Sequence, residues 1–157
     1  MRIVKWLFFC VLILGFLSCG KEEADNIIPS SPVNFMVNVR IQDTELTSSM
    51  KSKVFTQPRL SGEYVGYSGL LVVCSGDILA GGIYQLHAYD LCCTYEKQRS
   101  IKVEPEADGK AKCPKCGTLY NTFEGVGNPV SGPGTNNLQR YNVQPSGSEV
   151  GVFRIYH

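Results

Sequence analysis

Four cysteines stand in two short segments of this chain, and their spacing suits metal binding or disulfide formation. Cys92 and Cys93 are adjacent, and Cys113 and Cys116 follow within the sequence Cys-Pro-Lys-Cys-Gly. Thiolates are soft, charged donors, so two cysteine-bearing turns that converge can hold zinc or an iron–sulfur cluster. A segment rich in proline and glycine, residues 129–134, follows and is suited to shielding such a site from water.

The segments that must position these cysteines have the pattern of short β-strands. Apolar and polar residues alternate over much of the chain past residue 32, and Gly/Pro turns separate the runs. We expect strands at residues 33–41, 64–74, 83–89, 101–104, 111–113, 118–120, 140–143 and 150–156. The apolar run at 70–73 predicts a fully buried stretch, residues 75–77 a turn, and Asp108-Gly109 a hairpin. The fold class is therefore all-β, a small antiparallel sandwich or barrel.

Three segments, taken in their order along the chain, resemble the Rieske domain. Residues 88–90 resemble the strand that enters its first cluster-binding loop, and residues 113–120 resemble its second loop. Residues 125–133 and 138–141 resemble its proline loop and the strand that leaves it. The resemblance implies a two-loop cluster-binding subdomain on the β domain.

The ligand positions of that family are only partly kept. Its first loop reads Cys-x-His and its second Cys-x-x-His-Gly, with two cysteines on one iron and two histidines on the other. Cys93 and Cys113 match the cysteine pair, whereas Tyr95 and Cys116 stand where the family has histidines. A phenol stays protonated near neutral pH and is a poor ligand. The resemblance thus implies a [2Fe–2S] cluster in altered ligation, held by Cys93, Cys113 and Cys116, with Cys92 as the candidate for the fourth position.

The function that this resemblance implies is electron transfer to or from a redox partner protein, without catalysis by the chain itself. Three other states of the same thiols stay open: a structural zinc ion, a disulfide, or free thiols. With any of these, the chain is a non-redox structural or binding lipoprotein with the fold of the family.

The N-terminus has the features of a bacterial lipoprotein signal peptide. Arg2 and Lys5 precede an apolar run at 6–17, which is shorter than the roughly 20 residues needed to span a bilayer. Ser18 and Cys19 then resemble the end of a lipobox, in which the cysteine is acylated. We expect a signal peptide at 1–18, a polar tether at 19–32 and one β domain at 33–157. This places the domain in the bacterial cell envelope, anchored to a membrane through Cys19.

Other residues near the cysteines are expected to have ordinary roles. Cys74 ends a buried strand and is expected in the core. His87 is expected to be a strand histidine rather than a ligand. Asp90 and Glu96 are expected to cap or orient the first loop. Tyr141 is expected either to donate a hydrogen bond towards a cluster sulfur or to pack.

Charge and motif content narrow the class of function further. The formal net charge is +1, so the chain is nearly neutral and its charge gives no argument for nucleic-acid binding. The sequence has no serine–histidine–carboxylate set and no glycine-rich phosphate loop followed by lysine. It is also too short for the second iron domain of the large Rieske oxygenases. An electron carrier or a binding module is therefore expected, rather than an enzyme.

Overall fold

The computed structural model describes residues 27–147 and 149–157. The predicted signal peptide, Cys19 and most of the predicted tether lie outside the described residues. None of the helices in the described part of the chain is long and apolar enough to cross a membrane.

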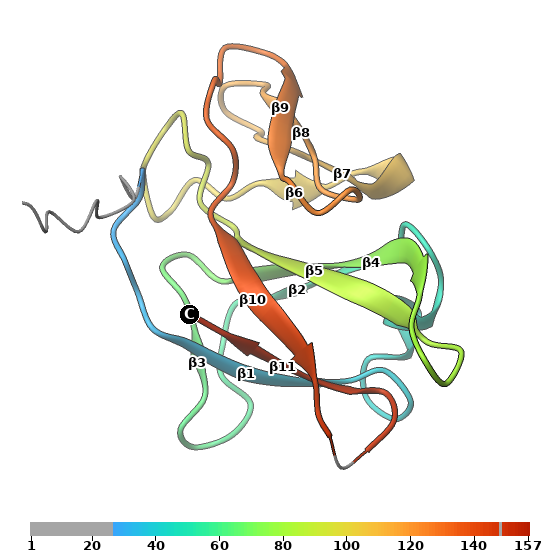
Figure 1. Ribbon diagram of the computed structural model, residues 1–157. Helices are drawn as coiled ribbons and strands as arrows, with labels where there is room; N and C mark the ends of the chain where they lie inside the picture. Colours follow the sequence, from blue (N-terminus) through green and yellow to red (C-terminus); the bar gives the residue numbers. More distant parts are fainter. Residues whose placement is uncertain (1–26, 148) are drawn as a thin grey trace, which may run out of the picture.

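The described chain is all-β, as predicted, with two short 3-10 helices. The strands and helices are β1 (Val33–Asn38), η1 (Thr44–Thr47), β2 (Ser52–Phe55), β3 (Tyr64–Val65), β4 (Leu70–Ile78), β5 (Tyr84–Asp90), β6 (Glu104–Pro105), η2 (Ala107–Gly109), β7 (Lys110–Lys112), β8 (Leu119–Asn121), β9 (Asn128–Ser131), β10 (Arg140–Pro145) and β11 (Val152–Tyr156). They form two antiparallel sheets (Figure 1).

The larger sheet has seven strands in the order β2-β4-β5-β10-β11-β1-β3 and curls into a nearly closed barrel. Side chains from its two ends meet inside: the rings of Phe35 on β1 and Phe55 on β2 have centroids 4.7 Å apart. The Arg59 guanidinium lies over both rings, 4.8 and 5.0 Å from their centroids. It also pairs with the buried Asp43 at 3.0 Å. This cluster holds the ends of the curled sheet together.

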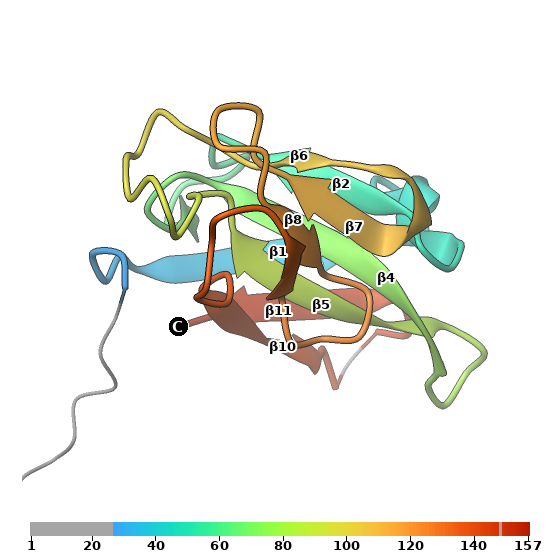
Figure 2. The same ribbon diagram turned by 90° about the horizontal axis from the view of Figure 1, so that it is seen from above.

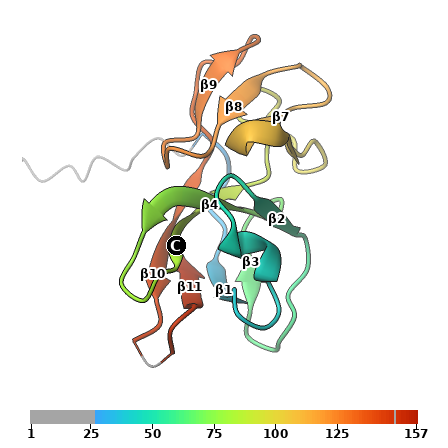
Figure 3. The ribbon, with the colours of Figure 1, turned by 90° about the vertical axis from the view of Figure 1, so that its right-hand side faces the viewer.

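The smaller sheet has four strands in the order β6-β7-β8-β9 and stacks on one side of the barrel (Figures 2 and 3). In sequence it is an insertion between β5 and β10. These two strands are neighbours in the barrel, with Arg140 paired to Tyr89 and Tyr141 to Ala88. The chain therefore leaves the barrel at the end of β5 and returns at the start of β10. Both cysteine segments lie in this insertion.

Strand β4 is buried on both faces, which explains its unbroken apolar sequence. Leu70, Val72 and Cys74 point into the barrel core. Leu71 and Val73 point the other way, into a second core between the barrel and the small sheet. The prediction of a fully buried stretch at 70–73 is confirmed, as is the prediction that Cys74 is a core residue.

Several predicted strands differ from the structure in extent. The expected single strand at 64–74 is two strands, β3 and β4, because Gly66 and Gly69 between them have positive φ angles of 80° and 121°. The expected turn at 75–77 is wrong: these residues continue β4, with a register shift between Cys74 and Ile78. The hairpin at Asp108-Gly109 is confirmed, since β6 pairs with β7 across it.

Candidate metal centre

The first cysteine turn, residues 93–97, begins shortly after the end of β5 at Asp90. The Cys93 N–H donates to the carbonyl of Ile101 at 3.1 Å, and the Lys97 N–H donates back to the carbonyl of Cys93 at 2.8 Å. Asp90, the last residue of β5, accepts the Cys92 N–H at 2.7 Å. It thereby orients the start of the turn, as predicted. The turn is thus tied to the barrel at its entry.

The second cysteine turn, residues 113–117, joins β7 to β8. The Cys113 N–H donates to the carbonyl of Thr118 at 2.9 Å, and the Gly117 N–H donates to the carbonyl of Cys113, also at 2.9 Å. Gly117 has φ of 76°, a left-handed conformation that glycine adopts without steric penalty. The turn brings residues 113 and 116 to the same side.

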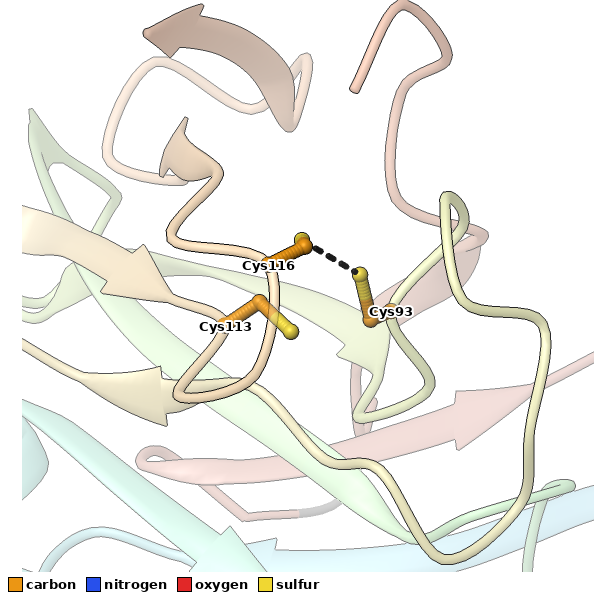
Figure 4. A group of neighbouring side chains, drawn as sticks. All are labelled: Cys93, Cys113 and Cys116. Carbon is orange, nitrogen blue, oxygen red and sulfur yellow. Dashed lines mark hydrogen bonds between the residues drawn. The ribbon is translucent and has the colours of Figure 1, made fainter. Parts of the chain in front are cut away.

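Three thiols from the two turns meet (Figure 4). The sulfur atoms of Cys93, Cys113 and Cys116 all lie within 4.8 Å of one another, and those of Cys93 and Cys116 are 3.7 Å apart. Cys93 and Cys113 are fully buried in the second core, whereas Cys116 lies at its edge and is half-buried. The predicted convergence of the two turns is confirmed. The three thiols form a group that could bind a metal ion.

Hydroxyl groups surround the sulfur atoms. The Tyr120 Oη lies 3.5 Å from the Cys93 Sγ and 3.2 Å from the Thr94 Oγ1, and the Thr118 Oγ1 lies 3.1 Å from the Cys116 Sγ. Burial raises the pKa of the Tyr120 phenol, so it stays protonated and can donate to a sulfur. Hydrogen bonds from hydroxyls to a thiolate favour its charged form.

The proline- and glycine-rich segment is not only a loop. It also supports the second cysteine turn. Part of it, Asn128–Ser131, is strand β9, paired with β8. Beyond β9, the Gly134 N–H donates to the Thr118 Oγ1 at 3.0 Å. Gly132 approaches so closely that a Cβ there would lie 2.5 Å from the Thr118 Cα. The segment therefore fixes the threonine that contacts Cys116.

The thiols differ in how readily they lose a proton. Burial raises the pKa of Cys113 to about 12. Burial also acts to raise the pKa of Cys116, but hydrogen bonds from the Thr118 hydroxyl and backbone outweigh it, so the net pKa lies below its ordinary value. The half-buried Cys116 thiol therefore loses its proton more readily than the Cys113 thiol. A bound cation would favour the charged form of all three thiols.

Cys92, the sequence-based candidate for a fourth ligand, is not among these three thiols. Its Sγ lies 3.7 Å from the carbonyl oxygen of Cys93 and 3.5 Å from that of Gln98. Burial raises its pKa to about 11. Adjacent residues in an extended segment point in opposite directions, which accounts for the separation from Cys93.

The remaining residues singled out from the sequence lie around the group. Tyr141 does not donate to a sulfur; its hydroxyl donates to the Asp90 Oδ2 at 2.8 Å. Glu96 forms an ion pair with Lys115 at 2.7 Å, which links the two cysteine turns. Tyr95 is exposed. His87 is buried, and its Nδ1 has no hydrogen-bond partner in the described part of the chain.

Sequence reasoning missed Thr118 and Tyr120, although a signal for them exists. They are two residues apart at the start of a predicted strand, so their side chains share one face, and Thr118 follows Cys116 by two residues.

Comparisons of the whole sequence with protein-family models and with curated proteins find no match. The case for a function therefore rests on the site itself.

Proposed function

We propose that this domain binds one tetrahedral metal ion, zinc, through Cys93, Cys113 and Cys116. The observation that carries the proposal is the meeting of three thiols from two turns within 4.8 Å. With zinc–sulfur bonds near 2.3 Å, two sulfurs of a tetrahedral site are about 3.8 Å apart. The 3.7 Å between the Cys93 and Cys116 sulfurs agrees with that spacing.

The role that we propose for zinc is structural. Zinc has no redox chemistry, and a closed thiolate site contributes directly to folding free energy. An ion here would tie the turn after β5 to the turn between β7 and β8, and so fix the small sheet to the barrel. The chain would then be a zinc-stabilised binding or structural module.

An electron-transfer protein with a [2Fe–2S] cluster is the second candidate. The hydroxyls of Tyr120 and Thr118 favour it, because hydrogen bonds to sulfur tune the potential of such clusters. Against it, a two-iron cluster divides its ligands between two irons. Ligands on different irons lie farther apart than two ligands on the same iron, so the ligands of a cluster are not all close to one another. Three mutually close thiols are therefore better suited to one ion.

Metal analysis of the full-length protein, purified anaerobically in detergent, tests this choice. We expect one zinc per chain, no visible absorption and no acid-labile sulfide. A coloured protein with two irons and two sulfides per chain would instead support the cluster. A colourless, metal-free protein in which Cys93 and Cys116 resist thiol labelling would instead support a disulfide between these two residues, whose sulfur atoms are 3.7 Å apart.

We further propose that the domain is lipid-anchored in the bacterial cell envelope through Cys19. The support is the short apolar run at 6–17 followed by Ser18, Cys19 and a polar segment. Metabolic labelling with a radioactive fatty acid should mark the wild-type chain but not Cys19→Ala. A wild-type chain that takes up no label would rule out this anchor.

A further inference from the structure

The two cysteine turns have the same backbone arrangement, although their sequences differ. In each, the N–H of the fifth residue donates to the carbonyl of the first: Lys97 to Cys93 at 2.8 Å, and Gly117 to Cys113 at 2.9 Å. In each, the fifth residue is left-handed, with φ of 54° at Lys97 and 76° at Gly117. Lysine in this conformation costs about 1 kcal/mol, so the turn is imposed by its surroundings.

The first and fourth residues of such a turn lie on the same side of it. Residues three apart in a tight helical turn are stacked above one another. In the second turn these positions hold Cys113 and Cys116, and both reach the group of three thiols. In the first turn they hold Cys93 and Glu96. Glu96 therefore holds the backbone position in the first turn that Cys116 holds in the second.

The Glu96 side chain also reaches towards the second turn. It is largely buried, with 12% of its side-chain surface exposed, and its carboxylate lies 2.7 Å from the Lys115 ammonium. Lys115 directly precedes Cys116, so the carboxylate is held beside the second turn. The Glu96 carboxylate does not lie within the group formed by the three thiols, so it would bind an ion there by leaving Lys115, whose side chain is 53% exposed, and turning towards the sulfur atoms.

The other nearby donors are committed elsewhere or are poor ligands. The Cys92 thiol contacts two backbone carbonyls. The Tyr95 side chain is exposed, and the Thr118 hydroxyl binds the Gly134 N–H. A carboxylate oxygen is an accepted zinc ligand beside thiolates.

We infer that Glu96 supplies the fourth ligand, so that each turn contributes its first and fourth residues to a Cys3Glu site. This inference rests on the proposed metal site.

Titration of the full-length protein with Co²⁺, a coloured substitute for zinc, tests the inference. Glu96→Gln keeps the size of the side chain but removes the anionic donor, and we expect Co²⁺ affinity to fall at least tenfold, roughly the effect of losing even a supporting partner of a ligand. Lys115→Gln breaks the same ion pair but keeps the carboxylate, so it should bind Co²⁺ with nearly wild-type affinity. Glu96→Cys should retain binding and raise the thiolate-to-cobalt absorption by about one third, because four thiolates replace three.

The outcomes separate this inference from the proposed metal site. If the wild-type protein binds Co²⁺ with the absorption of three thiolates, and Glu96→Gln has the same affinity and spectrum, Glu96 is not a ligand although the metal site stands. If Glu96→Gln and Lys115→Gln weaken binding equally, the ion pair matters and ligation does not. If wild-type protein binds no Co²⁺ under reducing conditions, the metal site itself is wrong, and the inference fails with it. Thermal melts in chelator should show the three variants folded.

Discussion

Replacing Asp90 by alanine is expected to lower the free energy of unfolding by about 4 kcal/mol or more. The carboxylate is fully buried at the end of β5. It accepts the backbone N–H groups of Tyr67, Ser68 and Cys92, and the hydroxyl of Tyr141. Alanine would leave these four donors without their acceptor, and for the three that belong to buried residues, Ser68, Cys92 and Tyr141, each loss costs about 1–3 kcal/mol. Water entering the space would recover part of the loss.

The loss should be measured by urea unfolding in the presence of a chelator, so that metal binding does not contribute. Tyr141→Phe removes one of the four donors together with its bond, and we expect a smaller loss of about 1–2 kcal/mol. It remains measurable if Asp90→Ala does not fold. Asp77→Ala changes an exposed aspartate on β4 and should stay within about 0.5 kcal/mol of wild type. A loss under 1 kcal/mol for Asp90→Ala would show that Asp90 does not organise this junction.

Asp90 also connects the fold to the candidate metal centre. One oxygen accepts the N–H of Cys92, one residue before Cys93, and the other accepts the Tyr141 hydroxyl, where the chain re-enters the barrel. Both crossings between the barrel and the inserted small sheet thus meet at one carboxylate. The sequence indicated that Asp90 orients the first loop, but the link to Tyr141 is a long-range contact that no local pattern contains.

The parts of the fold that sequence could predict are those with a strong local signal. The run Leu70–Val73 predicts a buried strand because all four side chains are apolar and two of them are valines, which favour strands. Strand β2 was missed, since Phe55 is its only fully buried residue. Strand β9 was missed because it contains Pro129, which is typical of a loop or a sheet edge. Strand β2 is defined by its pairing with β4 and strand β9 by its pairing with β8, and neither pairing can be read from the side-chain pattern of the short strand itself.

The same distinction applies to the site. The two cysteine turns could be found from spacing, and their convergence followed from the resemblance. Cys92 was chosen for its type and proximity in sequence, but the direction of its thiol depends on the backbone of the turn. Glu96 differs from Cys92: Cys-x-x-Glu has the spacing of Cys-x-x-Cys, but the equivalence of Glu96 to Cys116 appears only when the two turns are seen to share one backbone geometry.

Zinc is expected to stabilise the wild-type domain strongly, and the loss of this effect should identify the ligands. With free zinc at 100 times its dissociation constant, binding adds about 2.7 kcal/mol to stability. For a domain of this size that corresponds to a rise in melting temperature of about 10 °C. Cys116→Ala should abolish most of this rise, because one of the three thiol ligands is gone. Since Cys116 is half-buried, the metal-free variant should melt close to metal-free wild type.

Cys92→Ala provides the decisive comparison, because it removes a neighbouring buried thiol that contacts backbone carbonyls. It should melt below wild type in chelator, by the cost of a small cavity, yet keep the full rise with zinc. Cys74→Ala, a buried cysteine of the barrel core, is the matched control and should behave in the same way. The measurement is differential scanning calorimetry of each full-length variant under reducing conditions, with chelator and with zinc. If Cys92→Ala loses the zinc-dependent rise while Cys74→Ala keeps it, the Cys92 thiol turns to the metal on binding. The fourth ligand would then be the one first expected from the sequence, and Glu96 would serve only to pair with Lys115.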